Sequence, residues 1–328
     1  MRGMARLVSW WLPAVICAAA PAALGQTAAS QAAAPAVPSV SPLVVTAPPE
    51  ARVLRAMPFS KLEGLTYKFV ETHAAAAQPI QQYARWHEPV CPETLGLSDA
   101  DNAAVSQRIR DVAAEVGAPV EPPGKCVLDV EVMFTDQAQG FMDQVADRKP
   151  IFLGYHFVPQ TERLKQVKRP VQGWYATQTR GGVLVQIDAA GGGSGVGVTN
   201  PMEMGRMPGG CAGSHFTACL KSEFANVLIV VDANRMAGQP LGPLADYVAM
   251  LVLTRPASLD ACDEIPSILD RLSPACPGRA DTQGLTTFDL AYLKALYRTN
   301  MSMFGEVQRS NLAGALARTI KSSASDPK

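Results

Sequence analysis

The sequence predicts an α+β fold, in which a mixed sheet packs against helices. Segments rich in β-branched residues alternate along the chain with segments of helical periodicity. The longest apolar strand pattern, Phe224–Val231, is hydrophobic on both faces and is therefore expected in the middle of the sheet. We place all of these elements in one domain, residues 52–328, which is long enough for a single large core.

The first half of this domain contains two helices and one strand. Residues 85–97 are proline-rich and are expected to form an irregular surface loop pinned by Cys91. Ser98 can cap a helix that ends at Gly117, and residues 138–145 form a shorter helix. Between them, Val127–Phe134 alternates like a strand. The apolar face of the first helix consists of Val105, Ile109, Val112 and Val116.

The second half contains the most apolar segments. Gly173–Tyr175 leads into a strand at Val183–Ile187, and the strand Phe224–Val231 follows a glycine run. Pro243 is expected at the first position of an almost wholly apolar helix, Leu244–Leu253. Two further helices are expected, one opened by Thr286 with a T-x-x-D cap and one over Glu306–Ile320.

The N-terminal region resembles an export signal followed by a linker. Residues 1–25 combine a basic start, an apolar stretch and small residues before Gln26, and are expected to be a cleaved signal peptide. An uncleaved anchor helix is the alternative, although Pro13 and Pro21 interrupt the short apolar stretch. Residues 26–49 are uncharged and rich in Ala and Pro, which predicts a disordered leader over residues 26–51. We therefore expect a periplasmic or secreted protein without a stable membrane span after cleavage.

The charge balance argues against nucleic acid as a partner. The chain has 29 basic and 29 acidic residues, and cleavage after residue 25 removes Arg2 and Arg6, which leaves a net charge near −2. A nucleic-acid-binding surface would require an excess of Lys and Arg.

Six cysteines remain after the expected cleavage. An even number in an exported chain favours disulfides, and the cysteines fall into three local couples. We predict that the pairs, which follow the order of the sequence, are Cys91–Cys126, Cys211–Cys219 and Cys262–Cys276. A structural zinc site is the alternative, but no two cysteines have the C-x₂-C or C-x₄-C spacing.

Other patterns are weak indicators of a site. The glycine run Gly191–Gly197 matches neither a P-loop nor a dinucleotide fingerprint and is interpreted as a loop. No serine lies in a G-x-S-x-G elbow, although a Ser-His-Asp hydrolase with distant partners stays open. No two of the four histidines are spaced i,i+4. Each is therefore interpreted as a hydrogen-bonded residue rather than as a metal ligand. The four are His73, His87, His156 and His215.

The order of the elements in residues 226–303 resembles that of a known protein family. The strand NVLIVVD leads through a turn to the helix LADYVAMLVL, followed by PSILD, the helix LTTFDLAYLKALY and the tail NMSM. This order resembles the core of the zincin metalloproteases, and it is most similar to bacterial secreted proteins with degenerate zincin-like cores. The resemblance implies a zincin-like fold, with Leu244–Leu253 in the place of the helix that carries His-Glu-x-x-His.

The resemblance implies an inactive site. The motif positions fall on residues 245–249, where Ala245 and Ala249 replace the two histidines and Asp246 replaces the glutamate. Alanine has no lone pair for a metal, so no metal ligand or cofactor is expected. Asp246 is the only charged residue in the helix and is the one weak catalytic candidate. Its simplest interpretation is an exposed first-turn acid that interacts with the helix N-terminus.

The leading hypothesis is an exported, non-catalytic cell-envelope protein, a pseudoenzyme that binds or supports another component, with an envelope protein as a partner. The alternative is a metal-dependent hydrolase or peptidase whose site the sequence does not reveal. A third hypothesis is a small-ligand binder that uses the Gly191–Gly197 loop and the aromatic residues near Trp174.

Overall fold

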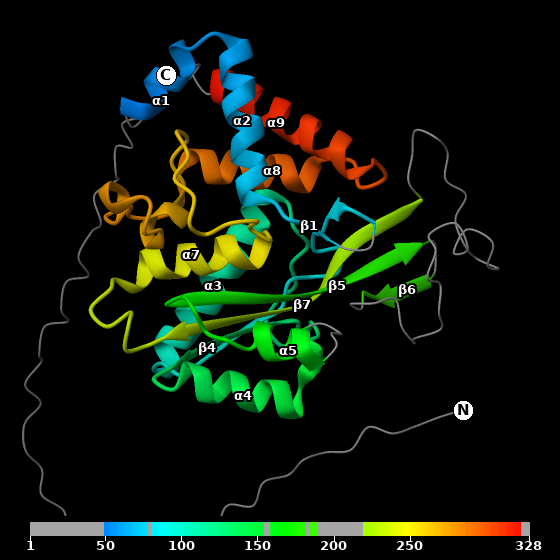
Figure 1. Ribbon diagram of the computed structural model, residues 1–328, viewed down its shortest axis with the longest axis vertical. Coiled ribbons are helices and arrows are strands. Elements are labelled where there is room, and N and C mark those ends of the chain that lie inside the picture. Colours follow the sequence, from blue (N-terminus) through cyan, green and yellow to red (C-terminus); the bar gives the residue numbers. More distant parts are fainter. Residues whose placement is uncertain (1–48, 78–79, 154–157, 182–183, 189–218, 323–328) are drawn as a thin grey trace, which may run out of the picture. The chain divides into compact units, whose positions relative to one another are not determined.

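The computed structural model describes residues 49–77, 80–153, 158–181, 184–188 and 219–322 (Figure 1). The expected signal peptide, most of the expected leader, the Gly191–Gly197 run, Cys211, His156 and His215 lie outside these residues. The helix α1 begins at Pro49, three residues before the expected start of the domain. Residues from Ala47 to the C-terminus belong to one unit.

A mixed five-stranded sheet forms the centre of this unit. The strand order is β3-β4-β7-β5-β6; β3, β4 and β7 are parallel, whereas β5 is antiparallel to both β7 and β6. The predicted apolar strand is thus central, because it lies within β7 between β4 and β5. The bounds are β3 Pro92–Leu95, β4 Val130–Thr135, β5 Val171–Gly181, β6 Leu184–Ile187 and β7 Leu220–Asp232.

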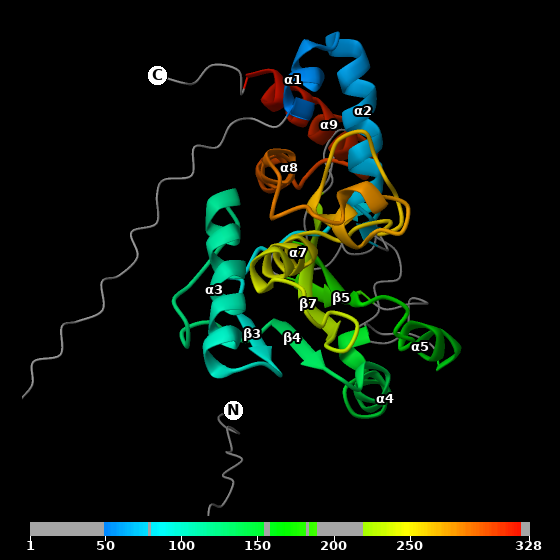
Figure 2. The same cartoon turned by 90° about the vertical axis from the view of Figure 1, so that its left-hand side faces the viewer.

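Helices cover both faces of the sheet (Figures 1 and 2), which confirms the predicted α+β class with a mixed sheet packed against helices. On one face, Val130, Val132 and Ile229 belong to the large core with α3 and α7; on the other, Leu228 and Val230 pack with α4. Helix α2 packs along α9. The α-helices among the described residues are α1 Pro49–Ala56, α2 Phe59–His73, α3 Asp99–Val116, α4 Ala138–Arg148, α5 Val158–Leu164, α7 Leu241–Leu253, α8 Thr287–Arg298 and α9 Gly305–Ser322.

Short elements complete the fold. A two-stranded ribbon pairs β1, Ala76–Ala77, with β2, Gln82–Tyr83. Three turns of 3₁₀-helix are η1 Pro150–Leu153, η2 Ile268–Leu272 and η3 Pro277–Arg279.

Helix α3 is bounded as its sequence predicts. The Ser98 side chain accepts a hydrogen bond from the backbone N–H of Asp101, and Gly117 ends the helix in the left-handed conformation at φ 87°. The predicted apolar face, which includes Val105 and Ile109, is buried. The helix therefore lies against the sheet, where it also contacts α7.

Helix α7 is buried from Pro243 to its last residue. Such a helix needs partners for its last carbonyl groups, because water does not reach them. Three aromatic side chains supply them. The Tyr175 hydroxyl donates to Leu251 O at 3.1 Å, the Trp86 indole to Val252 O at 2.9 Å and the Tyr297 hydroxyl to Leu253 O at 3.1 Å.

Three sequence-based boundaries need correction. The segment 85–97 is not wholly irregular, because Pro92–Leu95 forms the edge strand β3. Strand β4 begins at Val130 rather than Val127, whose side chain is 85% exposed beside the disulfide of Cys126. Helix α7 begins at Leu241, so Pro243 is its third residue rather than its first. The helices α1 and α2 were not predicted.

Two of the three predicted disulfides are present in the described residues. Cys91 pairs with Cys126 and Cys262 pairs with Cys276. Cys219 is also disulfide-bonded, and its predicted partner Cys211 lies outside the described part. The bridges are consistent with an oxidising, extracytoplasmic compartment. Among the described helices, none has the length and apolarity needed to span a membrane.

Candidate functional site

The motif positions of α7 cannot hold a metal. Ala245 is 4% exposed and Ala249 is fully buried, and a methyl group offers no electron pair at either position. Within the described residues, no group of three or more His, Cys, Asp or Glu side chains is arranged to bind a metal ion. The residues at these positions therefore do not fit a zincin-type zinc site.

Asp246 was interpreted as an exposed first-turn acid, but it is buried and links α7 to α3 and to the loop before α8. One carboxylate oxygen accepts from Arg108 Nε of α3 at 2.5 Å, and the other accepts from the backbone N–H of Leu285 at 3.0 Å. The same hydrogen bond raises the pKa of the Arg108 guanidinium. Because α7 begins at Leu241, Asp246 is its sixth residue and lies past the first turn. Both oxygens accept a hydrogen bond from the protein, and only 8% of the residue is exposed.

The PSILD and LTTFD motifs form two interlocked capping boxes. Ser267 caps η2 with Asp270, and Thr286 caps α8 with Asp289. The two boxes are joined because Ser267 Oγ donates to Asp289 Oδ1 at 2.6 Å and Thr286 Oγ1 donates to Pro266 O at 3.0 Å. Neither Ser267 nor Asp289 is exposed to solvent. The motifs therefore hold the loop before α8 in place.

His73 lies beside these boxes but cannot act as a general base. Its Nδ1–H donates to Phe69 O at 2.8 Å, and its ring stacks on Phe69 with 3.9 Å between the centroids. Burial lowers the pKa of His73, which keeps the ring neutral. A carboxylate oxygen of Asp263 lies 3.9 Å from Nδ1. His73 is 2% exposed, so a substrate does not reach it.

His87 is the other described histidine. Its side chain is about half exposed, and its Nδ1 lies 3.9 Å from Glu223 Oε1. The Glu223 side chain is fully buried, and its Oε1 accepts a hydrogen bond from Nε of Arg180 at 2.8 Å. The Arg180–Glu223 ion pair links β5 to β7, and His87 lies next to it.

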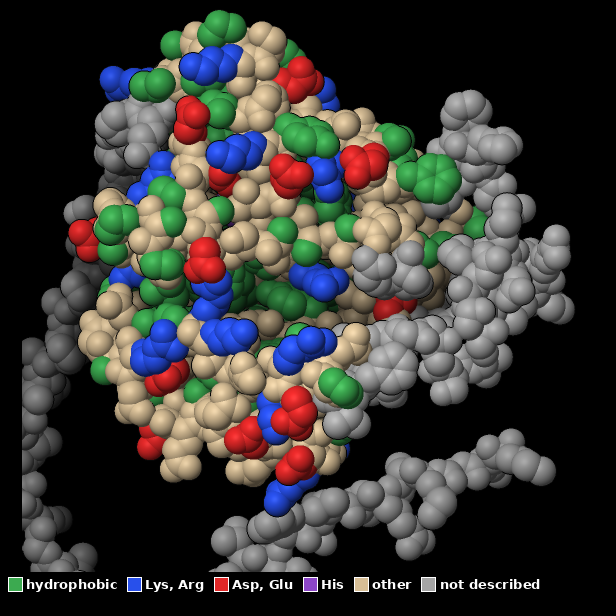
Figure 3. Space-filling view, in the orientation of Figure 1, with side chains coloured by type: hydrophobic (Ala, Val, Ile, Leu, Met, Phe, Trp, Pro, Cys, Tyr) green, Lys and Arg blue, Asp and Glu red, His purple; other side chains and the backbone are tan. Residues whose placement is uncertain are grey.

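A basic pocket lies at the end of β7. It is defined by its nine lining residues and has a volume of about 550 Å³, within the range of roughly 300–1,000 Å³ typical of small-molecule sites. In Figure 3, Lys and Arg side chains gather across the middle of the face that the view presents. The lining residues are Lys168, Arg169, Pro170, Arg235, Asp260, Arg271, Leu272, Ser273 and Pro274.

Two walls form the basic pocket. Residues 168–170, which precede β5, and Arg235, which follows β7, make one wall; Asp260 and residues 271–274 make the other. An ion pair joins the walls: Arg169 Nη1 donates to Asp260 Oδ1 at 2.6 Å, and Nη2 donates to Oδ2. The pair raises the pKa of Arg169 and lowers that of Asp260. The pocket lies beyond the C-terminal end of the central strand, a position at which open sheets often bind ligands.

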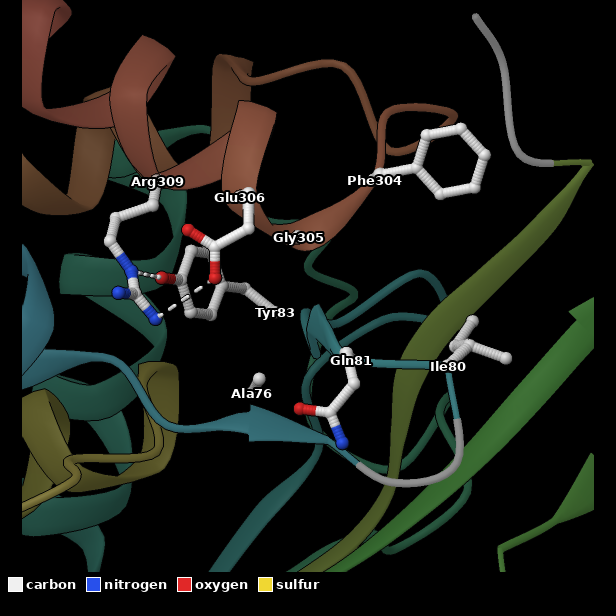
Figure 4. A pocket seen from close by; sticks show the side chains of 8 residues that line it. All are labelled: Ala76, Ile80, Gln81, Tyr83, Phe304, Gly305, Glu306 and Arg309. Carbon is white, nitrogen blue, oxygen red and sulfur yellow. Dashed lines mark hydrogen bonds and ion pairs between the residues drawn. The ribbon is translucent and has the colours of Figure 1, made fainter. Parts of the chain in front are cut away.

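A second cavity of about 290 Å³ lies between the β1–β2 ribbon and the start of α9 (Figure 4). Its charged groups neutralise each other, because Arg309 donates to the Tyr83 hydroxyl at 3.0 Å and lies 3.8 Å from Glu306. Phe304 and Ile80 point away from this cluster in Figure 4. Its charged groups therefore pair with each other rather than with a ligand, and this smaller cavity is the weaker candidate.

The comparisons with known proteins found no relative. No family model matches the chain, no curated protein matches its sequence, and no solved structure matches its fold.

The sequence alone did not predict the basic pocket. Its four cations come from three segments between residues 168 and 271, and none of them belongs to a motif. One signal was present: Lys168, Arg169 and Pro170 directly precede a strand. That signal alone does not show that Arg235 and Arg271 converge on the same cavity.

Proposed function

We propose that the chain is an exported, non-catalytic binding protein of the cell envelope, built on a degenerate zincin-like scaffold. The proposal rests on the residues of α7 and on their contacts. Two alanines occupy the positions of metal ligands, and the only charged residue holds α3 and the loop before α8. A hydrolase of this type would need a metal-bound water and a carboxylate free to polarise it.

The zincin-like scaffold is supported by the order of the elements. Strand β7 is followed by α7, then by the loop with η2, and then by α8. Helix α7 contacts both β7 and η2. In this arrangement the former catalytic helix is a packing element, and its rigidity preserves the surface of the loops that surround it.

Export is supported by the disulfides and by the N-terminal sequence. The bridge Cys262–Cys276 encloses the segment that forms one wall of the basic pocket. A bridge in this position restrains a loop used for binding. Such a restraint is useful in a compartment where the disulfide persists.

A hydrolysis assay on the purified mature chain tests the proposal. Wild-type protein and Asp246→Asn are incubated with generic peptide, ester and phosphoester substrates, with and without added zinc. We expect no turnover above buffer for either protein. Turnover that Asp246→Asn abolishes while the melting temperature is unchanged would make the chain an enzyme and refute the proposal.

A further inference from the structure

We propose that the basic pocket binds a small organic phosphate monoester. This inference rests on the proposed binding function and adds the site and the ligand class. Phosphate monoesters are dianions with three terminal oxygens and an organic group. Each of these features has a counterpart in the pocket.

The pocket has more cationic than anionic side chains. Four cationic side chains and one carboxylate line it, which leaves an excess of three positive charges. Only Arg169 is neutralised, by Asp260. The three other cations are available to a ligand, and they are Lys168, Arg235 and Arg271.

These three cations have no acidic partner in the part of the chain that the structure describes. Arg271 donates to two neutral acceptors, Thr282 O at 2.7 Å and Gln239 Oε1 at 2.6 Å. Arg235 reaches only the carbonyl oxygen of Lys168, at 3.4 Å. The Lys168 ammonium is exposed and makes no ion pair with the described residues. A dianion would therefore complete the electrostatics of the pocket.

The wall that carries Arg271 is held in place by contacts within the protein. Arg271 belongs to η2, which the interlocked capping boxes hold. Arg279 adds an ion pair to Asp270 of the same turn, at 2.6 Å. A site whose donors are already positioned loses little conformational entropy on binding. This rigidity favours a small ligand of defined shape over a flexible polyanion.

The number of donors favours phosphate over carboxylate. Three cations from two walls can each address one of the three terminal oxygens of a phosphate, whereas a carboxylate presents two oxygens in one plane. The apolar residues of the pocket complete the match. Pro170, Leu272 and Pro274 line it beside the cations and suit the organic part of an ester.

The test is calorimetric titration of the mature chain with three probes. Phenyl phosphate is the ester, phthalate is a dicarboxylate with the same ring, and inorganic phosphate lacks the ring. We expect phenyl phosphate to bind at least about tenfold more tightly than either of the others. No binding, or equal binding of phthalate, would overturn the inference.

A pair of charge-matched variants locates the site. Lys168→Gln combined with Arg235→Gln should weaken phenyl phosphate binding by about tenfold or more, because each change removes a charged donor. The control combines Arg52→Gln with Lys61→Gln, two exposed residues of α1 and α2 that lose the same total charge. It should change the affinity less than about twofold. An equal loss in both variants would show diffuse electrostatics and refute the site.

The same samples separate this inference from the proposed function. Release of inorganic phosphate from bound phenyl phosphate would confirm the site but refute a non-catalytic role. Absence of both binding and hydrolysis would refute the site and leave the non-catalytic role in place.

Discussion

Asp246 offers the sharpest test of how helix α7 is held in place. Its carboxylate accepts from the backbone N–H of Leu285 and from Arg108, and 8% of the residue is exposed. Asp246→Ala leaves the partly buried Leu285 N–H without its acceptor, which costs about 1–3 kcal/mol. The Arg108 side chain is 40% exposed, so solvent screens its contribution to well below about 1 kcal/mol. We therefore expect Asp246→Ala to lower the free energy of unfolding by about 1–3 kcal/mol, most of it from the Leu285 N–H.

Asp246→Asn separates the two contacts. The amide oxygen can still accept from Leu285, so this variant should lose only the screened Arg108 contact, well below about 1 kcal/mol. Chemical denaturation followed by circular dichroism measures both variants, and Asp147→Asn, an exposed acid of α4, is the control. Gly284→Ala provides an independent probe, because a Cβ at Gly284 would lie 2.6 Å from Asp246 Oδ2. It should destabilise the wild type more than it destabilises Asp246→Ala.

A double-mutant cycle tests the ion pair directly. Arg108→Gln alone should cost less than about 1 kcal/mol, and its coupling to Asp246→Ala should be about 0.5–1 kcal/mol. If Asp246→Ala is as stable as Asp147→Asn, or if the coupling is zero, the tie between α3 and α7 does not contribute to stability and our reasoning is wrong.

Three further predictions concern the core, the bridges and the pH dependence of stability. Leu251→Ala opens a cavity in a fully buried helix and should lower the free energy of unfolding by about 2–5 kcal/mol in chemical denaturation. Non-reducing peptide mapping should recover Cys262–Cys276, and reduction should lower the melting temperature because each bridge contributes about 2–4 kcal/mol; a crossed pairing would contradict the structure. Burial raises the pKa of the Asp129 carboxyl from 3.8 to about 7 in the folded state. The folded state therefore binds the carboxyl proton more tightly than the unfolded state does. The stability gained from this protonation is lost as the pH rises through about 7. Asp129→Asn should therefore raise the melting temperature at pH 8 relative to wild type more than at pH 4, and an equal change at both pH values would refute this assignment.

The sequence predicted the elements whose signals are local. The Ser98 cap, the Gly117 end of α3 and the T-x-x-D cap at Thr286 were confirmed, because a cap depends on residues within one turn. The central position of β7 was also predictable, since only a strand covered on both faces tolerates such a continuous apolar run. The start of α7 was wrong by two residues, because Leu241 and Gly242 carry no capping signal.

Features that depend on tertiary contacts were missed. Asp246 has the pattern of a solvent-facing acid, and only the packing of α3 against α7 brings Arg108 to it. Edge strand β3 is four residues long and contains a proline, so its pairing with β4 outweighs a weak local preference. The basic pocket likewise exists only because the chain brings three segments together.

The most direct test of the central claim is the metal content of the native protein. The mature chain is purified without chelators or metal-affinity steps, and zinc is measured by elemental analysis against protein concentration. Because Ala245 and Ala249 cannot ligate and Asp246 is held by Arg108 and Leu285, we predict zinc far below one equivalent. Stoichiometric zinc that is lost in Asp246→Asn would contradict the account and favour a metal-dependent hydrolase.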